Sequence, residues 1–210
     1  MSQIQQLPRE FYARNTMHVA HDLLGMSLVR VEGELRLKGI IIEVEAYRGE
    51  EDLGCQARAG QTKRTEIMYG SPGHAYVYFT YGMHWMLNFV TEREGFPAAV
   101  LIRAIQIEEG KTIVASRRSK QPANRWTDGP AKLCKALNID GRLNGYDLCQ
   151  TYAELFVESN YGKPICQFEV KSTPRIGLNG VPEPWKSVPW RFCTVNQGEI
   201  KKDGRTLDLD

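Results

Sequence analysis

Two glutamates and a tyrosine stand at alternate positions near the end of a strongly apolar segment. Glu43, Glu45 and Tyr47 belong to the run 39–47, whose centre is rich in β-branched residues and predicts a buried strand. Because side chains alternate along a strand, these three residues should share a face with Ile41. The opposite face should then carry the other apolar side chains, Ile40, Ile42, Val44 and Ala46.

A core strand rarely places two acids and a phenol on one side, because burying an unpaired charge is costly. Two interpretations follow for this face. Either its Glu45 end opens into a pocket, or the strand lies at the edge of a sheet with its polar face in solvent. A carboxylate at the wall of a pocket is suited to general acid–base chemistry.

Three more candidates occur in strand-like segments further along the chain: Tyr78, Asn88 and Arg103. Arg103 interrupts an apolar run, where a charge is expensive unless a partner accompanies it. Each candidate also has a purely structural interpretation. The tyrosines could be core residues, Asn88 could satisfy backbone groups, and Arg103 could form an ion pair with Glu43.

Other catalytic chemistries find little support in the sequence. The five cysteines are widely spaced and form no C-x-x-C pair, which predicts neither a disulfide framework nor a zinc site and favours a reducing compartment. The four histidines show no metal-ligand spacing, and no glycine-rich phosphate loop is present. We therefore expect no metal and no cofactor.

The composition is that of an ordinary globular protein. The 210 residues are 42% hydrophobic and 25% charged, and the net charge of +2 is too small to indicate a nucleic-acid partner by itself. The N-terminal residues lack the apolar core of a signal peptide, and no apolar run is long enough to span a membrane. These features predict a cytoplasmic protein without membrane contact.

The elements that would position the candidates can be outlined from caps, turns and periodicity. Asn15 or Thr16 can cap a helix that ends at Gly25, because asparagine and threonine are good caps and glycine ends helices well. A second helix should begin at Asp128-Gly129-Pro130 and run through Leu137. Strands are expected at 27–31, 39–47, 75–80, 85–91 and 98–105. Between the second and third of these strands, we expect a loop at 48–64 and a helical turn at 65–69.

The strands 75–80 and 85–91 are close enough to form a hairpin with Tyr81 at or near its tip. A basic segment, 111–126, follows the strand at 98–105, and the remainder alternates turns and short strands. We predict one α+β domain covering residues 1–210, with a polar tail at about 201–210. Its sheet should be curved and mainly antiparallel, flanked by short helices and long loops.

Several segments resemble blocks of the alkyladenine (3-methyladenine) DNA glycosylase family, the type that lacks a helix-hairpin-helix. They occur in the family's order from the first helix nearly to the C-terminus, which makes the resemblance far more specific than one short motif. The segments are Ile42-Glu43-Val44-Glu45-Ala46-Tyr47, Pro72-Gly73-His74-Ala75-Tyr76-Val77-Tyr78, Tyr81-Gly82-Met83-His84, Val100-Leu101-Ile102-Arg103-Ala104, Gly129-Pro130-Ala131-Lys132-Leu133-Cys134-Lys135-Ala136-Leu137, Pro174-Arg175-Ile176-Gly177 and Pro189-Trp190-Arg191-Phe192.

The resemblance implies a monofunctional base-excision repair enzyme, a monomer that hydrolyses the N-glycosidic bond of damaged purines in double-stranded DNA. Such an enzyme needs no metal and no lysine Schiff base. It flips the damaged base out of the stack before cutting. Two alternatives stay open: a damage-binding protein that flips bases without excising them, and a hydrolase of free nucleosides.

The resemblance also assigns roles to single residues. Glu45 matches the general base, and Arg103 matches the residue that holds this carboxylate and its water. Tyr47 and Tyr78 match the stacking residues, and Asn88 matches a residue that discriminates against the exocyclic amine of guanine.

Further matches concern DNA. Tyr81 matches the side chain that enters the minor groove and fills the space left by the base. We also expect Met83, Arg64 and Lys132 to contact DNA, although the basic residues could equally form a solvated surface.

The sequence departs from the family pattern at two positions. Gln56 stands where the family commonly has a histidine that donates a hydrogen bond to the flipped base. An amide can donate too, but it cannot titrate and its reach differs. Thr65 stands where the family usually has asparagine after Arg64. These departures put the substrate preference in doubt, but not the reaction class.

Overall fold

The computed structural model describes residues 6–159 and 168–196, and its main feature is one large antiparallel sheet. Its strands are β1 Ser27–Glu32, β2 Leu35–Arg48, β3 Ala75–Thr80, β4 His84–Val90, β5 Ala98–Glu109, β6 Leu155–Glu158, β7 Phe168–Thr173 and β8 Arg191–Asn196. The helices are α1 Arg9–Tyr12, α2 Thr16–Leu23, α3 Lys111–Arg117 and α4 Pro130–Ala136. The α+β class and the mainly antiparallel sheet are confirmed.

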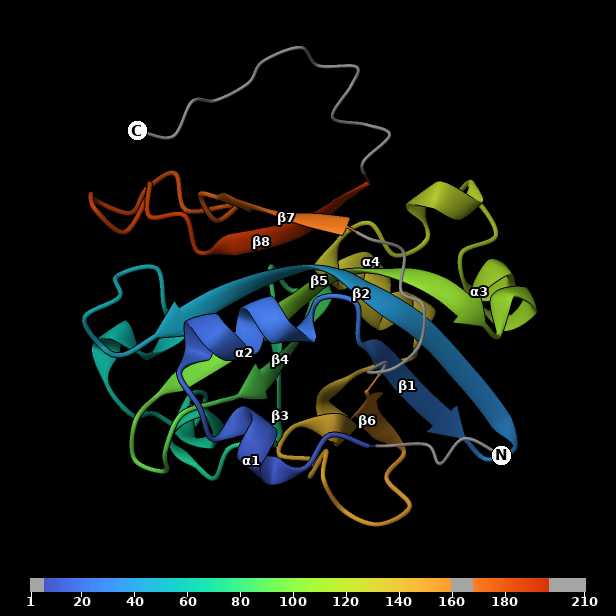
Figure 1. The fold of residues 1–210 in the computed structure, drawn as a ribbon, viewed down its shortest axis with the longest axis horizontal. Helices are drawn as coiled ribbons and strands as arrows, with labels where there is room; N and C mark the ends of the chain where they lie inside the picture. The colour runs from blue at the N-terminus through green and yellow to red at the C-terminus, as the bar shows by residue number, and fades with distance from the viewer. Residues whose placement is uncertain (1–5, 160–167, 197–210) are drawn as a thin grey trace.

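The two longest strands, β2 and β5, form the middle of the sheet. The strand order is β3-β4-β5-β2-β1-β6, and β8 pairs with both β2 and β7. Because β2 has neighbours on both sides, the edge-strand interpretation of the Glu45 segment is wrong. Figure 1 shows β2 crossing the whole width of the molecule in front of β5.

The predicted alternation along β2 holds only for its second half. The pairing of β2 with β5 changes register between Ile41 and Glu43 and again before Val44, which marks a β-bulge. An extra residue of this kind re-aims the side chains on one side of it. Ile41 therefore packs in the main core with Val44 and Ala46 instead of sharing the face of the glutamates.

Helix α2 forms as its sequence predicts, and it follows the short helix α1, which was not predicted. The side chain of Asn15 accepts a hydrogen bond from the N–H of Met17 at 3.0 Å, and Gly25 follows the helix with a positive φ of 80°, a conformation that glycine adopts without strain. The buried side chains of α2 include Val19, Ala20 and Leu23, which belong to the main core.

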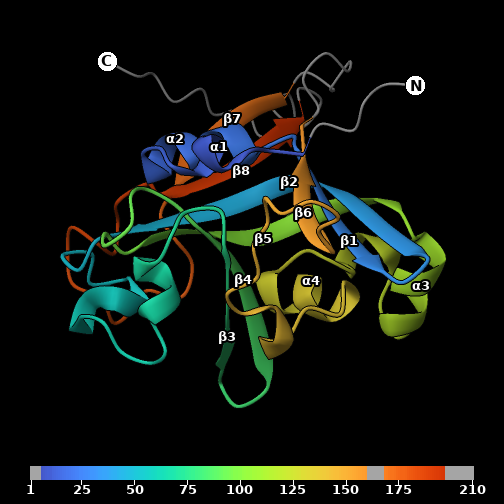
Figure 2. The same cartoon turned by 90° about the horizontal axis from the view of Figure 1, so that it is seen from below.

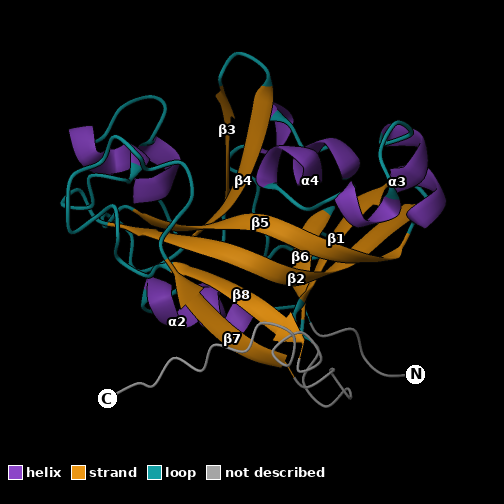
Figure 3. Cartoon of the chain, turned by 90° about the horizontal axis from the view of Figure 1, so that it is seen from above, coloured by secondary structure: helices purple, strands orange, loops and turns teal. Residues whose placement is uncertain are grey.

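Strands β3 and β4 form the predicted hairpin, which projects from the rest of the molecule (Figure 2). Thr80 pairs with His84 at its end, and Tyr81 between them has a φ of 52°. Figure 3 shows that α3 and α4 lie on the side of the sheet toward which this hairpin points, whereas α2 lies on the other side, near the strands β7 and β8 that continue the sheet from β2.

Some elements were not predicted. The basic segment contains α3, and the loop 48–64 contains a short 3₁₀ turn at Gln56–Ala59. The polar tail at 201–210 lies outside the described residues, and the single-domain assignment for 1–210 stays a prediction. In the part of the chain that the structure describes, no helix is both long and apolar enough to cross a membrane.

Candidate active site

The carboxylate of Glu45 is fully buried and is held by two hydrogen bonds and one ion pair. The phenol of Tyr47 donates to Oε2 at 2.8 Å, and Nη1 of Arg103 lies 3.1 Å from the same oxygen. The backbone N–H of Ile176 donates to Oε1 at 2.7 Å. A charge that would be costly to bury alone is thus balanced by a cation and two neutral donors.

Arg103 reaches this carboxylate from β5, the strand next to β2. Its Nε donates to Oε1 of Glu43 at 2.6 Å, so one guanidinium joins both glutamates of the β2 face. Burial lowers the pKa of Arg103, but the nearby carboxylates of Glu45 and Glu43 raise this pKa by more than burial lowers it. The pKa of Arg103 therefore lies above its usual value. Arg191 also donates to Oε1 of Glu43, at 2.7 Å. The ion pair with Glu43 was the structural alternative for Arg103, and it coexists with the contact to Glu45.

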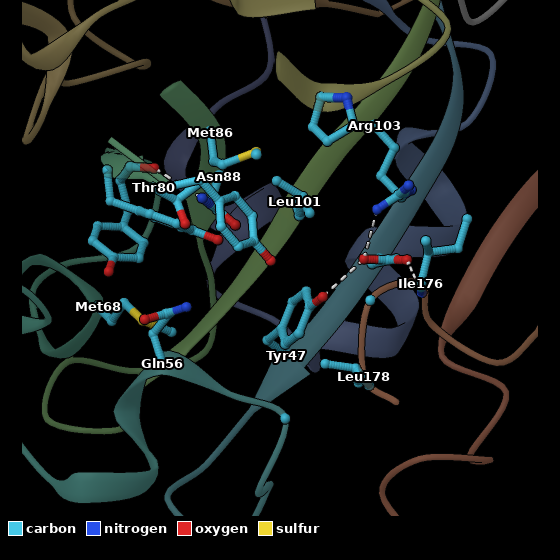
Figure 4. Close-up of a pocket in the computed structure, with 17 residues that line it drawn as sticks. Tyr47, Gln56, Met68, Thr80, Met86, Asn88, Leu101, Arg103, Ile176 and Leu178 are labelled. Carbon is cyan, nitrogen blue, oxygen red and sulfur yellow. Dashed lines mark hydrogen bonds and ion pairs between the residues drawn. The ribbon is translucent and has the colours of Figure 1, made fainter. Parts of the chain in front are cut away.

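The Glu45 carboxylate forms part of the wall of a cavity of about 220 Å³, and Figure 4 shows the side chains that line this cavity. This volume is below the roughly 300–1,000 Å³ typical of pockets for drug-sized ligands. The cavity has an acidic and a basic group at one end, Glu45 and Arg103, and the rest of its lining is mainly aromatic and apolar, with a few neutral polar side chains. The remaining lining residues are Tyr47, Gly54, Gln56, Met68, Tyr76, Tyr78, Thr80, Tyr81, Met86, Asn88, Leu101, Pro130, Ile176, Gly177 and Leu178.

Two of the aromatic walls carry a guanidinium over one face of the ring. Arg175 lies 4.6 Å from the centre of the Tyr47 ring, and Arg64 lies 5.0 Å from that of Tyr78. Burial, reinforced by the neighbouring Glu45, raises the pKa of Tyr47 well above its usual value. Burial also raises the pKa of Tyr78 to about 12. Both phenols are therefore neutral at physiological pH, and Tyr47 remains a donor to Glu45.

Two amide side chains complete the polar lining. Gln56 lies at the start of the 3₁₀ turn Gln56–Ala59 and is one of the residues that line the cavity (Figure 4). Asn88 is nearly buried and donates from Nδ2 to the carbonyl of Tyr76 at 3.1 Å, so the backbone role considered for it exists beside its place in the lining. Thr65 lies outside the cavity and bonds within its own turn, donating to the carbonyl of Gly60 at 3.1 Å.

Of the predicted DNA contacts, only Tyr81 is among the residues that line the cavity, and Arg64, Met83 and Lys132 are not. Tyr81 is 80% exposed and Met83 is 68% exposed at the hairpin tip. Met83 and Lys132 line a second hollow, between the hairpin and α4. Nζ of Lys132 also lies 2.8 Å from Oδ1 of Asp128, which is the pairing expected of a solvated helix surface.

Sequence reasoning gave no role to the segment 174–178, although Pro174-Arg175-Ile176-Gly177 was among the segments of the resemblance. Ile176, Gly177 and Leu178 form one side of the cavity. Arg175 is fully buried in an ion pair with Asp52, a residue that no motif singled out. Only the resemblance could have drawn attention to this segment, since nothing in its own residue pattern indicates a partner more than a hundred positions away.

The arrangement can bind a flat aromatic ligand and act on it as a base. Aromatic walls favour stacking with a planar ring, and a carboxylate held by donors can accept a proton or stabilise a developing positive charge. Within residues 6–159 and 168–196, no three histidine, cysteine, aspartate or glutamate side chains gather in a group that could hold a metal ion.

Comparison with known proteins identifies the family to which the chain belongs. The profile of the methylpurine-DNA glycosylase family matches residues 10–198. A relative from Methanocella arvoryzae is 46% identical over 93% of this chain and 96% of its own. A relative from Carboxydothermus hydrogenoformans is 43% identical over 93% of this chain and 98% of its own. One from Desulfitobacterium hafniense is 41% identical over 90% of this chain and 95% of its own. All three are provisionally named 3-methyladenine DNA glycosylases. The chain belongs to the methylpurine-DNA glycosylase family.

Proposed function

We propose that the protein is a monofunctional DNA glycosylase that hydrolyses the N-glycosidic bond of damaged purines flipped out of double-stranded DNA. The observation that carries the proposal is the fully buried Glu45 carboxylate at one end of a cavity with aromatic walls. Family membership and the names of the relatives agree with it. The damaged purines in question are 3-methyladenine and 7-methylguanine, with hypoxanthine and ethenoadenine as further candidates.

In the proposed reaction, Glu45 activates a water molecule. The bond between the sugar and the base breaks with its electron pair going to the base, and the sugar develops oxocarbenium character. Water bonds to the anomeric carbon and gives a proton to Glu45. A carboxylate offers about four lone-pair sites, and hydrogen bonds from Tyr47 and Ile176 occupy two of them. The Glu45 carboxylate therefore keeps acceptor capacity for the water beside its ion pair with Arg103.

The flipped base would be held by stacking between the rings of Tyr47 and Tyr78. A cationic base such as 3-methyladenine gains additional attraction from aromatic faces and leaves as a neutral molecule. Gln56 and Asn88 would provide hydrogen bonds to the base edge, and Asn88 is the residue we propose to disfavour the exocyclic amine of guanine.

The hairpin tip would enter the duplex, with Tyr81 in the space vacated by the base and Met83 beside it. Arg64 and Lys132 would contact phosphates near the lesion. Since no step requires a cofactor or a second subunit, we propose that the protein acts as a monomer. An enzyme of this kind works where the DNA is, which in a bacterial cell is the nucleoid within the cytoplasm.

A single-turnover excision assay tests the proposal. Duplexes each carrying 3-methyladenine, 7-methylguanine, hypoxanthine or ethenoadenine are mixed with excess protein, and release of the free base is followed against an undamaged duplex. We expect release from at least one damaged duplex and none from the control. Tight lesion binding without release would favour the damage-binding alternative. Cleavage of free nucleosides, insensitive to salt and to duplex DNA, would favour the nucleoside hydrolase.

Replacing the hairpin tyrosine tests its role as a wedge. We expect Tyr81→Ala to weaken binding and excision of a paired lesion more than of a lesion opposite a gap, because a gap lowers the cost of unstacking. Tyr152→Ala is the matched control, since Tyr152 is 97% exposed, also has a positive φ, and lines neither the cavity nor the second hollow. Equal losses on both substrates would indicate a packing role instead.

Gln56→His tests the departure from the family pattern. Neutral lesions depend most on polar contacts in the cavity, because they bring neither a positive charge nor a weakened glycosidic bond. One hydrogen bond between neutral groups contributes on the order of 1 kcal/mol, so we expect Gln56→His to change hypoxanthine excision roughly severalfold and 7-methylguanine excision little. We expect the wild-type protein to prefer cationic purines. Gln61→His, at an exposed position outside the cavity lining, is the control, and an unchanged ratio of the two rates in Gln56→His would refute the prediction.

A further inference from the structure

We propose that the buried ion pair of Asp52 and Arg175 is a positioning element, which holds the general base Glu45, the ring of Tyr47 and the loop of Gln56 in one fixed geometry. This inference rests on the proposed glycosylase function. It gives a task to the segment 174–178, to which the reaction described above assigns only the N–H of Ile176.

Asp52 and Arg175 form a bidentate ion pair. Both side chains are completely buried, and Nη1 and Nη2 of Arg175 lie 2.5 and 2.7 Å from the two carboxylate oxygens of Asp52. A fully buried ion pair adds little net stability compared with apolar side chains of the same volume, since both charges lose their hydration. Its distinctive property is directional, because a bidentate contact fixes the two groups in distance and in orientation.

The guanidinium extends this fixed geometry to β2. Nη1 of Arg175 also donates at 3.0 Å to the carbonyl of Ala46, the residue between Glu45 and Tyr47. The guanidinium packs over the Tyr47 ring at 4.6 Å. The next residue along the chain, Ile176, donates its N–H to Glu45. One side chain therefore contacts the stacking residue directly and fixes the segment that holds the general base.

Asp52 extends the same geometry to the loop that carries Gln56. Its Oδ1 accepts a hydrogen bond from the N–H of Gly54 at 2.9 Å, and its backbone carbonyl accepts one from the N–H of Cys55 at 2.8 Å. The loop packs very closely on the segment 174–178. A Cβ added at Gly54 would lie 2.8 Å from Nη2 of Arg175 and 2.8 Å from a methyl group of Leu178, closer than any ordinary contact.

Three walls of the cavity are thus joined through one ion pair. A displacement of about 1 Å in a reacting group can cost roughly 100-fold in rate even when the substitution is remote from the chemistry. If Asp52 loses its charge, the Arg175 guanidinium has no counterion. The position of this guanidinium, which relates Ala46, Tyr47 and Ile176 to one another, is then no longer fixed. The consequence should be a loss of rate in the bound complex that exceeds the loss of affinity for the lesion.

The test is single-turnover excision by Asp52→Asn at saturating protein, measured well below its melting temperature and compared with its affinity for the same lesion duplex. We expect the rate to fall about 100-fold and the affinity to fall much less. Glu158→Gln is the matched control. Glu158 is another buried carboxylate with two cationic partners, Arg36 and Lys38, and it lines none of the cavity. This variant should lose stability and keep its rate.

Two further variants separate positioning from folding. Arg175→Lys keeps the charge but loses the bidentate contact, so we expect it to remain slow. The double variant Asp52→Asn with Arg175→Gln leaves no unpaired buried charge and should be the more stable of the Asp52 variants, yet it should also remain slow. A wild-type rate in Asp52→Asn or in the double variant, or an equal loss of rate in Glu158→Gln, would overturn the proposal.

Hydrogen exchange at the Ile176 amide provides a readout that does not need activity. We expect its protection to fall in Asp52→Asn and to be unchanged in Glu158→Gln. Unchanged protection in Asp52→Asn would overturn the positioning role even if the wild-type protein were active. A wild-type protein that releases no base from any lesion would instead refute the proposed function, and the exchange measurement would still decide whether the ion pair holds the segment.

Discussion

Glu45→Gln should abolish excision while largely preserving affinity for a lesion duplex. The amide keeps the shape of the side chain but cannot accept a proton from water, and general bases typically contribute about 10²–10⁴-fold to a rate. Single-turnover excision and lesion binding, measured on the same duplex, check this. A loss of less than about tenfold would remove Glu45 from the role of general base.

Glu43→Gln is the comparison that makes this result specific. Glu43 lies on the same strand and binds Arg103 and Arg191, but it does not line the cavity. Its substitution should act mainly through stability and through the position of Arg103, with a much smaller loss of rate. Glu45→Gln also has a stability cost of its own, because its amide N–H₂ must face one of the donors that now point at the carboxylate.

Arg103→Gln should reduce both excision and stability. The substitution removes the one cation in contact with the Glu45 carboxylate among the described residues, and removing one partner of a buried ion pair costs about 3–5 kcal/mol. We expect the lower end of this range, since Glu45 keeps the donors from Tyr47 and Ile176. At roughly 2–4 °C per kcal/mol for a chain of this size, the melting temperature should fall by about 6–12 °C.

The rate should fall by roughly 100-fold, because the carboxylate and its water are no longer held in a fixed geometry. Thermal unfolding and single-turnover excision at a temperature where the variant is folded measure the two effects separately. Arg191→Gln is the matched control, as Arg191 contacts Glu43 but is not among the cavity-lining residues. An Arg103→Gln variant as active as Arg191→Gln would show that Arg103 acts only through folding.

Glu45→Gln and Arg103→Gln test different properties of the same site. Glu45 is buried at the cavity wall, where an ionised carboxylate is useful for chemistry and costly for folding. Arg103 offsets that cost and is itself buried between two carboxylates. Loss of Glu45 should therefore appear mainly in the rate, whereas loss of Arg103 should appear in both the rate and the melting temperature.

Local residue patterns were sufficient for much of the fold. The apolar run around Glu45 predicted β2, the cap at Asn15 predicted α2, and the spacing of two aromatic strands predicted the hairpin with Tyr81 at its tip. Each of these features depends on neighbours within a few positions of the chain, which is the range over which caps, turns and periodicity act. The resemblance to a family then brought Glu45, Tyr47, Tyr78, Asn88 and Arg103 together as one site.

The tertiary structure decided the features that depend on distant partners. The bulge that turns Ile41 toward the core arises from pairing between β2 and β5, and no local pattern marks it. The N–H that holds Glu45 comes from Ile176, 131 positions further along the chain, and Asp52 meets Arg175 across 123 positions. A backbone donor carries no side-chain signature, and a lone aspartate or arginine in a sequence does not specify its partner. Such contacts exist only once folding has brought these distant segments together, so only the folded structure identifies them.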